Sequence, residues 1–259
     1  MKHQHNTPIA LVTGASAGFG AAICRVFAGA GWRVIGAARR ADKLQTLRDE
    51  IDAAFLPLPL DVSDKAAVAA AVGSLPADWK NIEVLVNNAG LALGLERADA
   101  ASLDDWERMV ATNINGLLYM THTLLPKMLH RGSGTIINIG SIAGNWPYFG
   151  GNVYGATKAF VEQFSLNLRA DLAGTPIRVS VIEPGLCSGT EFSAVRFHGD
   201  EKRADAVYEG VQAVTPDDIA RTVLWIAQQP AHVNINRIEI MPVAQSFAGL
   251  SVAREKNRA

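Results

Sequence analysis

Three side chains within one short stretch of the chain could serve a single reaction: Ser141, Tyr154 and Lys158. Tyr154 and Lys158 are four residues apart, so on a helix they lie on the same face. A free phenol has a pKa of about 10, which makes it a poor acid–base catalyst near neutral pH. A neighbouring ammonium favours the phenolate, so we expect Lys158 to lower the pKa of Tyr154. The tyrosine would then exchange a proton with a carbonyl or alcohol oxygen that Ser141 holds by a hydrogen bond.

A tyrosine and a lysine at this spacing also occur in many helices as a surface pair, or as a core tyrosine beside a solvated lysine. The elements around them decide between these interpretations. Apolar runs alternate with helical patterns along the whole chain. Strands are predicted at residues 8–13, 33–38, 55–60, 82–86, 134–139, 177–182 and 237–241, and helices at 18–30, 41–53, 64–72, 102–129, 152–173 and 216–228.

This alternation predicts an α/β fold of the Rossmann type: a doubly wound, seven-stranded parallel sheet with helices on both faces, forming one domain over residues 1–259. Pro57 and Pro59 indicate that the third strand lies at an edge or is irregular. Pro126 is expected to bend or break the helix that Ser102 begins. The polar, irregular segment at about 186–214 follows the sixth strand, where a long excursion is expected to cover the ligand crevice.

A glycine-rich turn follows the first strand and opens the first helix. Gly14, Gly18 and Gly20 have the spacing G-x-x-x-G-x-G, a variant of the dinucleotide fingerprint. The first glycine permits the tight turn, the second lets the backbone approach a pyrophosphate, and the third allows close helix–strand packing. Any strand–helix turn can use glycines, but this position in the fold favours a bound dinucleotide, which would supply a nicotinamide to the site around Tyr154.

The end of the second strand indicates which dinucleotide is bound. NAD sites usually place a carboxylate there, whereas this chain has Arg39 and Arg40. Arginine can bind a 2′-phosphate with a fork of donors, so the sequence favours NADP. The alternative is that both arginines are solvated residues at the start of a helix, where cations oppose the helix dipole.

With the glycine turn, Asn88-Ala89-Gly90, Ser141 and the Tyr154–Lys158 pair in this order, the chain resembles the short-chain dehydrogenase/reductase family over essentially its whole length. The resemblance implies hydride transfer with a nicotinamide cofactor. It also implies a homo-oligomer, with a tetramer favoured, because family members commonly assemble through long helices and the last strand.

The resemblance assigns catalytic roles to four residues. Tyr154 matches the acid–base, Ser141 the residue that holds the substrate oxygen, and Lys158 the residue that binds the nicotinamide ribose and lowers the tyrosine pKa. Asn113 matches an asparagine that bends its helix and holds a water linking the lysine to solvent.

The glycine turn, the arginines and the resemblance together predict a set of cofactor-binding positions. Family members often have a threonine four residues after the proline of the Pro184-Gly185 turn, but this chain has Ser188 there, so the carboxamide contact could belong to Ser188 or to Thr190. The predicted positions are Gly14, Ser16, Gly18, Phe19, Gly20, Arg39, Arg40, Asp61, Val62, Asn88, Ala89, Gly90, Tyr154, Lys158, Pro184, Gly185, Ser188 and Thr190.

A narrower resemblance covers residues 139–148, 150–160, 189–192 and 230–236. These stretches are similar to the NADP-dependent 3-hydroxy acid dehydrogenases, a group that includes serine 3-dehydrogenases, L-allo-threonine dehydrogenases and malonic semialdehyde reductases. The similarity implies a short 3-hydroxy acid or its 3-oxo acid as substrate. Arg196 is the candidate for the substrate carboxylate, although it could instead pair with Glu191 or lie in solvent.

Three aromatic residues between Ser141 and Tyr154 could wall the substrate pocket or belong to an interface: Trp146, Tyr148 and Phe149. The predictions for substrate contacts are therefore Ser141, Tyr148 and Arg196.

Composition limits the other functions. The formal net charge is −1, from 24 basic and 25 acidic side chains, which gives no reason to expect nucleic acid or an anionic membrane as a partner. Cys24 and Cys187 lack metal-type spacing, and no metal site is predicted; a disulfide between them has little support. No signal peptide or long apolar run is evident, so we expect a cytoplasmic protein with a small-molecule substrate.

The main hypothesis is therefore an NADP-dependent oxidoreductase that interconverts a short 3-hydroxy acid and its 3-oxo acid. One alternative is the same chemistry on a different ketone or aldehyde. A more remote one is a non-catalytic NADP-binding protein, which would have no need for the complete Asn113, Ser141, Tyr154 and Lys158 set.

Overall fold

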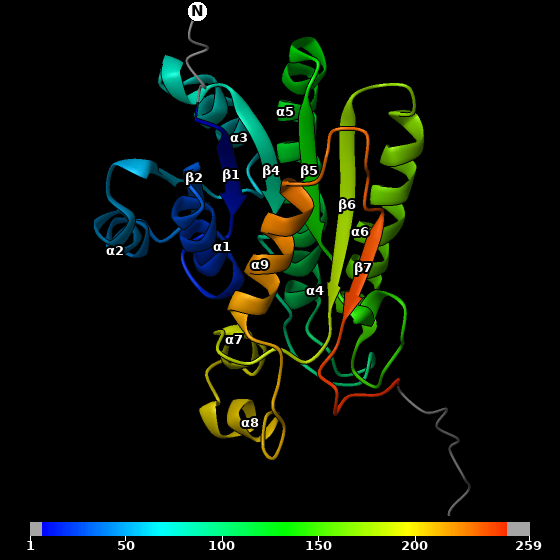
Figure 1. Ribbon diagram of the computed structural model, residues 1–259. Coiled ribbons are helices and arrows are strands. Elements are labelled where there is room, and N and C mark those ends of the chain that lie inside the picture. The colour runs from blue at the N-terminus through cyan, green and yellow to red at the C-terminus, as the bar shows by residue number, and fades with distance from the viewer. Residues whose placement is uncertain (1–6, 248–259) are drawn as a thin grey trace, which may run out of the picture.

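A parallel sheet runs through the protein, and its seven strands follow the order β3-β2-β1-β4-β5-β6-β7 (Figure 1). The computed structural model describes residues 7–247. The central strands are buried on both faces, which explains why their sequences are nearly continuous apolar runs. The strands are β1 (Ile9–Thr13), β2 (Arg33–Ala38), β3 (Phe55–Pro59), β4 (Ile82–Asn87), β5 (Gly134–Ile139), β6 (Ile177–Pro184) and β7 (Arg237–Ile240).

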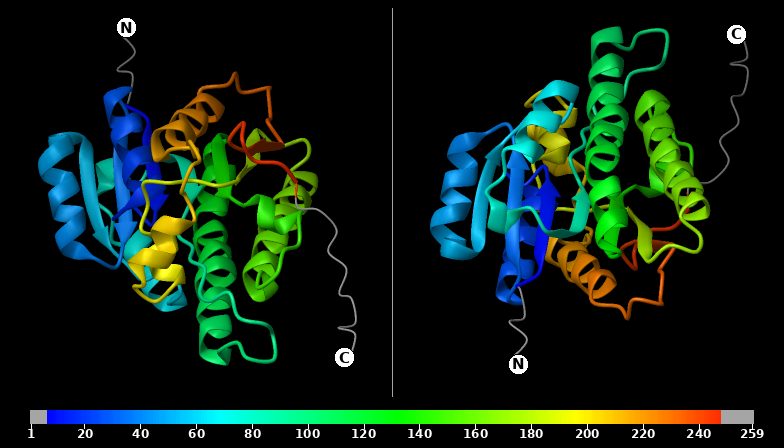
Figure 2. Two further views of the ribbon diagram at one scale, coloured as in Figure 1. Left: turned by 90° about the horizontal axis from the view of Figure 1, so that it is seen from below. Right: turned by 90° about the horizontal axis from the view of Figure 1, so that it is seen from above.

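Helices cover both faces of the sheet (Figures 1 and 2). One face packs against α1 (Gly18–Gly29), α2 (Ala41–Ile51) and α9 (Pro216–Ala227), whose buried side chains join one hydrophobic cluster with β1 and β2. The other face packs against α3 (Lys65–Gly73), α5 (Leu117–Arg131) and α6 (Asn152–Asp171). Helix α4 (Leu103–Val110) precedes α5, and 3-10 turns occupy Asp52–Ala54, Ala77–Trp79 and Ile142–Gly144. The predicted doubly wound fold is confirmed.

The third strand lies at one edge of the sheet, as its two prolines predicted. Within the described part of the chain, Pro57 and Pro59 pair with β2 alone. No strand lies on their outer side to need the N–H groups that proline lacks. Strand order reverses between β1 and β4, and in such sheets the ligand crevice lies outside the carboxyl ends of the strands at that point. The glycine turn after β1 therefore occupies the expected cofactor position.

The prediction for Pro126 is wrong where it expects a broken helix. Helix α5 continues through Pro126, which lies on its exposed face, where water can bond to the carbonyl left without a donor. The predicted long helix is interrupted earlier instead, by a π-helical turn at Ala111–Gly116 between α4 and α5. Such wide turns often occur at functional positions, and this one carries Asn113.

The covering segment (residues 186–214) is less irregular than predicted. It contains the short helices α7 (Phe192–Arg196) and α8 (Glu201–Ala206), which lie beyond the carboxyl ends of the strands (Figure 1). Hydrogen bonds join it to the body of the domain, such as the one from Gly94 N to Arg196 O at 2.9 Å. Within residues 7–247, none of the helices has the length and apolar character that a membrane crossing requires.

Candidate active site

The predicted catalytic serine, tyrosine and lysine come together where β5 and α6 meet. Ser141 follows β5, while Tyr154 and Lys158 occupy the first turns of α6, with only 8% and 7% of their surfaces exposed. Two glycines permit this approach. A Cβ atom on Gly144 would lie 2.8 Å from the Lys158 carbonyl carbon, and one on Gly155 would lie 2.9 Å from Ala143 O. The turn after Ser141 therefore rests directly on the backbone of α6.

Burial is the main influence on the pKa values of Tyr154 and Lys158. Desolvation raises the pKa of the Tyr154 phenol, while a hydrogen bond with Ser141 and the charge of Arg196 act in the opposite direction. Burial lowers the pKa of Lys158 to about 8, and its Nζ atom donates to Ile139 O at 2.8 Å. The expected lowering of the tyrosine pKa by Lys158 is therefore not seen in the protein alone, because burial opposes the phenolate.

Asn113 links three parts of the site through its amide. Its Oδ1 atom accepts from Leu91 N at 2.9 Å, and its Nδ2 atom donates to Leu91 O at 2.9 Å and to Thr157 Oγ1 at 3.0 Å. Thr157 precedes Lys158 on α6 and is itself buried. A Cβ atom on Gly90 would lie 3.3 Å from Asn113 Oδ1 and 3.5 Å from Lys158 Nζ. Asn113 thus joins the loop after β4 to the helix that carries Tyr154.

The glycine turn has the form of a dinucleotide cradle. Gly14 and Gly18 have φ angles of +67° and +51°, which favour glycine, and Gly20 packs so closely on Gly14 O that a side chain cannot fit. Phe19 is the second residue of α1 and packs against the core. Helix α1 has no side-chain cap on its first N–H groups, so they remain available to an anion. These features fit a bound pyrophosphate.

The Asn88-Ala89-Gly90 stretch is fixed to the glycine turn through Thr13. Thr13 Oγ1 accepts from both Asn88 N and Ala89 N at 3.0 Å, and Asn88 Nδ2 donates to Thr13 O at 2.8 Å. After the edge strand β3, Asp61 accepts from Ser63 N at 3.0 Å and from Ser63 Oγ at 2.7 Å. Val62 is buried and lies against Gly116 of the π-helical turn.

Arg40 lies beside the glycine turn, at the position predicted for the 2′-phosphate. Its guanidinium donates to Ser16 Oγ from Nε at 3.2 Å and from NH2 at 3.1 Å. It also forms a bidentate pair with Glu191 of the covering segment, at 3.1 and 2.8 Å. Arg39 is exposed nearby, and its charge contributes to lowering the pKa of Asp61.

The turn after β6 closes the cofactor side of the site. Ser141 Oγ donates to Pro184 O at 3.4 Å, and Gly185 N donates to Ile240 O at 2.7 Å. Thr190 lies close to the glycine turn, since a Cβ atom on Gly18 would be 3.1 Å from its Cγ2 atom. Ser188 N bonds to Val214 O instead. Cys187, in the same turn, and the buried Cys24 are both free thiols.

Arg196 reaches the catalytic group from the covering segment. Its NH2 atom donates to Tyr148 Oη at 2.7 Å and its Nε atom to Gly94 O at 3.2 Å. Its guanidinium carbon is 5.6 Å from the centre of the Tyr154 ring. The alternative pairing with Glu191 is not the one seen, because Glu191 bonds to Arg40.

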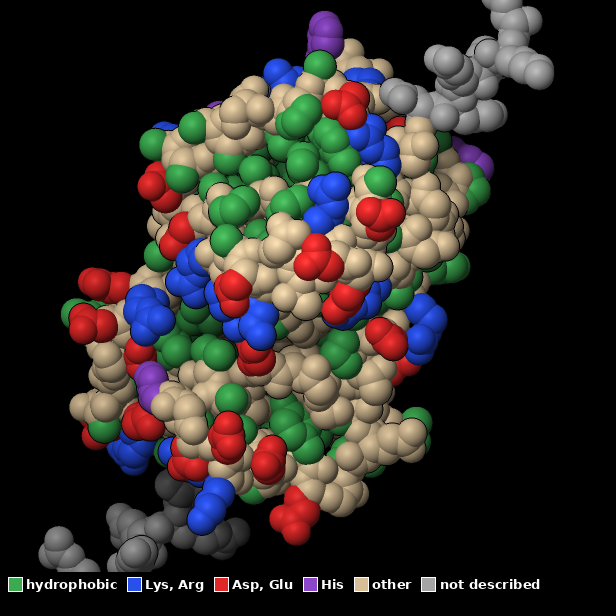
Figure 3. All heavy atoms as spheres, turned by 90° about the vertical axis from the view of Figure 1, so that its left-hand side faces the viewer, with side chains coloured by type: hydrophobic (Ala, Val, Ile, Leu, Met, Phe, Trp, Pro, Cys, Tyr) green, Lys and Arg blue, Asp and Glu red, His purple; other side chains and the backbone are tan. Residues whose placement is uncertain are grey.

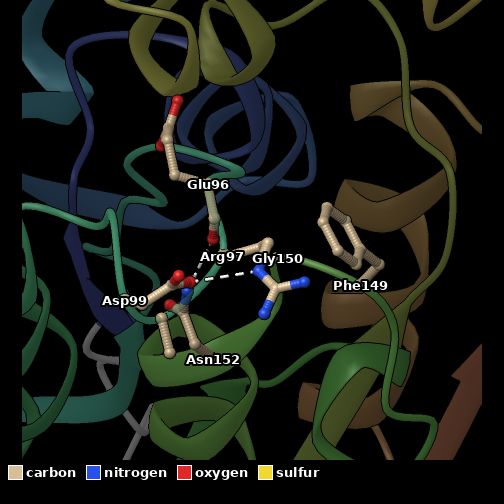
Figure 4. Close-up of a pocket in the computed structure, with 7 residues that line it drawn as sticks. Glu96, Arg97, Asp99, Phe149, Gly150 and Asn152 are labelled. Carbon is tan, nitrogen blue, oxygen red and sulfur yellow. Dashed lines mark hydrogen bonds and ion pairs between the residues drawn. The ribbon is translucent and has the colours of Figure 1, made fainter.

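The three aromatic residues before α6 have different surroundings. Tyr148 faces Arg196, whereas Trp146 packs on Phe247, with ring centres 4.4 Å apart, and donates to Glu239 at 3.2 Å. Phe149 is 74% exposed and lines an outer hollow of about 470 Å³ together with the 96–99 loop (Figure 4). The residues lining this hollow include none of the predicted catalytic set. Only Tyr148 therefore adjoins the catalytic group.

Sequence reasoning missed three residues that organise the site. The roles of Thr13 and Thr157 became evident only from their hydrogen-bond partners in the structure. In the sequence, a threonine at the end of a strand or inside a helix has no distinctive pattern around it. Glu191 was considered as a partner of Arg196, but its contact with Arg40 joins positions that are 151 residues apart.

The chain matches the family model for the short chain dehydrogenases over residues 8–201. It is 61% identical over 246 residues to the NADP-dependent 3-hydroxy acid dehydrogenase YdfG of Salmonella typhi, covering 95% of this chain and 99% of the relative. It is 51% identical over 245 residues to the serine 3-dehydrogenase of Agrobacterium fabrum, covering 95% and 98%.

A solved structure described as the closed form of serine dehydrogenase complexed with NADP+ has the same fold. It aligns with a TM-score of 0.94 at 57% identity and covers 95% of this chain and 100% of that chain. The cradle after β1 and the arginines after β2 fit the same cofactor. The chain therefore belongs to the short-chain dehydrogenase family and is an NADP-dependent oxidoreductase that acts on CH–OH groups.

Proposed function

We propose that this enzyme interconverts a short 3-hydroxy acid and its 3-oxo acid, with serine, allo-threonine or 3-hydroxypropionate as representative substrates. The observation that carries this proposal is the position of Arg196. Its guanidinium carbon lies 5.6 Å from the Tyr154 ring centre, and two of its donors are oriented by Tyr148 Oη and Gly94 O. A substrate carboxylate held there would place a hydroxyl on the β-carbon, two bonds from the carboxylate carbon, within reach of Tyr154. The similarity to 3-hydroxy acid and serine dehydrogenases supports this assignment.

In the oxidation direction, Tyr154 takes the proton of the substrate hydroxyl and Ser141 donates a hydrogen bond to the same oxygen. NADP+, when bound, supplies the hydride acceptor and a positive charge that favours the phenolate. Lys158 holds the nicotinamide ribose and stabilises the phenolate, and Asn113 connects this proton route to the loop after β4. In the reverse direction Tyr154 returns the proton to the carbonyl oxygen.

The remaining contacts are assigned to the cofactor. Arg39 and Arg40 bind the 2′-phosphate, the glycine turn with Ser16 and Phe19 binds the pyrophosphate, and Asp61 with Val62 flanks the adenine. Asn88, Ala89 and Gly90 border the adenine ribose. Thr190 is preferred to Ser188 for the carboxamide, since Thr190 lies against Gly18. The covering segment encloses the substrate, and we expect the enzyme to work in the cytoplasm.

Arg196→Ala tests the carboxylate assignment. We expect kcat/KM for L-serine and 3-hydroxypropionate to fall roughly 10- to 100-fold, because a charge-assisted hydrogen bond contributes about 1.5–3 kcal/mol. Activity on a neutral secondary alcohol of similar size should change little. The comparison is made by NADP+ reduction at 340 nm over both substrates.

Arg221→Ala on α9 is the matched control, because it removes an exposed arginine that pairs with Asp218 away from Tyr154. It should leave both activities unchanged. Equal losses on acids and neutral alcohols in Arg196→Ala would reject the carboxylate clamp and favour another carbonyl substrate.

A further inference from the structure

The covering segment places a carboxylate on the arginine that we assign to the 2′-phosphate. Glu191 precedes α7, and its two oxygens accept from NH1 and NH2 of Arg40 at 3.1 and 2.8 Å. Ser16 Oγ accepts from Nε and from NH2. A guanidinium has five N–H donors in a fixed fork, and Ser16 and Glu191 together engage four of those of Arg40, including both terminal nitrogens.

A carboxylate and a phosphate present similar geometry to an arginine. Both accept parallel bonds from its fork, so they compete for the same two nitrogens. The two side chains of the pair are 43% and 51% exposed, which means that water screens the pair and that it can open at small cost. A dianionic phosphate on the ribose carries more charge than Glu191 and also brings the rest of the dinucleotide to the cradle, so it can displace the carboxylate.

We propose that Glu191 is an intramolecular competitor of the cofactor 2′-phosphate, and that it sets both the affinity and the release rate of NADP(H) from the covering segment. The proposal rests on the role assigned above to Arg40. A cofactor without this phosphate has no group to exchange for Glu191, so the residue acts only on NADP(H). When NADP(H) is released, Glu191 pairs with Arg40 again, so the arginine keeps an anionic partner.

Glu191→Gln tests whether Glu191 and the 2′-phosphate compete for Arg40, and the test needs only binding measurements. We expect the Kd of NADPH and of 2′,5′-ADP to fall about two- to five-fold at low ionic strength, the range for loss of an exposed ion pair. The release rate of NADPH, measured by stopped-flow fluorescence, should slow by a similar factor. NADH and 5′-ADP, which lack the 2′-phosphate, should bind as they do to the wild-type protein.

Glu209→Gln is the matched control, since it removes the same charge from an exposed position in the same segment. It should change none of these constants. An unchanged Kd for 2′,5′-ADP in Glu191→Gln, or equal tightening of NADPH and NADH, would overturn the proposal.

Arg40→Ala separates this proposal from the one on which it rests. If Arg40→Ala weakens 2′,5′-ADP but not 5′-ADP, the role of Arg40 stands, and Glu191→Gln should then have no further effect in the Arg40→Ala background. A persistent effect there would overturn the competition. If Arg40→Ala leaves 2′,5′-ADP binding unchanged, both assignments fail, whereas the 3-hydroxy acid activity is judged separately by the Arg196→Ala assay.

Discussion

In the proposed mechanism, Tyr154 loses a proton in an environment that disfavours charge. Its side chain is buried, and the desolvation that raises its pKa is only partly offset by Ser141 and Arg196. Lys158 is also buried, so its own ammonium is weakened and its pKa falls to about 8. Two buried groups of this kind need a further positive charge to favour the phenolate, and an oxidised nicotinamide carries one. The site is therefore expected to be competent for proton abstraction only with NADP+ bound.

Tyr154→Phe separates catalysis from cofactor binding. The substitution removes the phenolic proton but keeps the ring that packs against Phe192, with centres 5.7 Å apart. We expect kcat to fall by about 10²–10⁴, the usual contribution of a general acid–base, while the Kd of NADPH changes less than about two-fold. Steady-state turnover and NADPH fluorescence titration provide the two measurements.

Tyr119→Phe, on α5, serves as the control for loss of a phenol away from the site. Retention of most of the wild-type turnover in Tyr154→Phe would show that another group transfers the proton.

Helix α7, although it is short, connects the two positions that we assign to anions. Glu191 immediately precedes it and contacts Arg40, and Arg196 ends it and faces Tyr148. The cofactor phosphate and the substrate carboxylate would therefore bind at opposite ends of one element.

The turn after Ser141 is held by an unusual buried acid on β6. Glu183 is almost fully buried, accepts from Asn145 Nδ2 at 2.9 Å, and has Arg237 Nε at 3.6 Å. Glu162 of α6 and Glu239 of β7 also face Glu183. Burial is the main cause that raises the pKa of Glu183 to about 7, and the negative charges of these two residues raise it further. Its Oε1 atom has no hydrogen-bond partner among the described residues, which adds to the cost of ionising it.

Glu183→Gln should change how stability depends on pH. The pKa of Glu183 lies near 4.5 in the unfolded chain and about 7 in the folded protein, so the folded state binds more protons between these values. The wild-type free energy of unfolding therefore contains a contribution that is complete below pH 4.5 and is lost as pH rises through 7. The glutamine cannot ionise, and we expect the variant to be more stable by about 1–3 kcal/mol at pH 8 but nearly equal at pH 4.5.

Urea unfolding of both proteins at the two pH values measures this difference, with Glu209→Gln as an exposed control. A variant that is equally or less stable than the wild type at pH 8 would contradict the assigned burial cost.

The helices and strands were largely predictable from the sequence, because the buried strands of a doubly wound sheet are apolar runs. Pro57 and Pro59 even located the edge strand. The local exceptions were predictable only in part: the resemblance implied a bend in the helix at Asn113, but not its π-helical form at Ala111–Gly116, and the sequence did not show that Pro126 faces solvent. Side-chain exposure and contacts between residues distant in sequence depend on tertiary packing. The contact between Arg40 and Glu191 could not be predicted from the sequence for the same reason.

At the scale of the whole molecule, the two edges of the sheet differ. The side nearest β3 carries acidic and basic side chains interspersed, as suits a surface in water (Figure 3). At the other edge, β7 pairs only with β6 among residues 7–247, and several large apolar side chains near it are exposed. These are Trp146 (38%), Val243 (106%) and Phe247 (53%). An open strand edge beside exposed apolar residues is a surface that proteins usually cover.

The family resemblance implies homo-oligomers, with a tetramer favoured, and from the exposed apolar side chains we expect the β7 edge to be one interface. Val243→Asp tests this, because the valine is fully exposed in the single chain and its replacement should not disturb the fold. We expect the wild type to have a mass near four times 27.6 kDa by sedimentation equilibrium, and the variant to form smaller species with unchanged circular dichroism. Ala53→Asp, an exposed change beside the β3 edge, should leave the mass unaltered. A wild-type protein that sediments as a single chain would exclude the assembly, and an undiminished mass in Val243→Asp would move the interface away from β7.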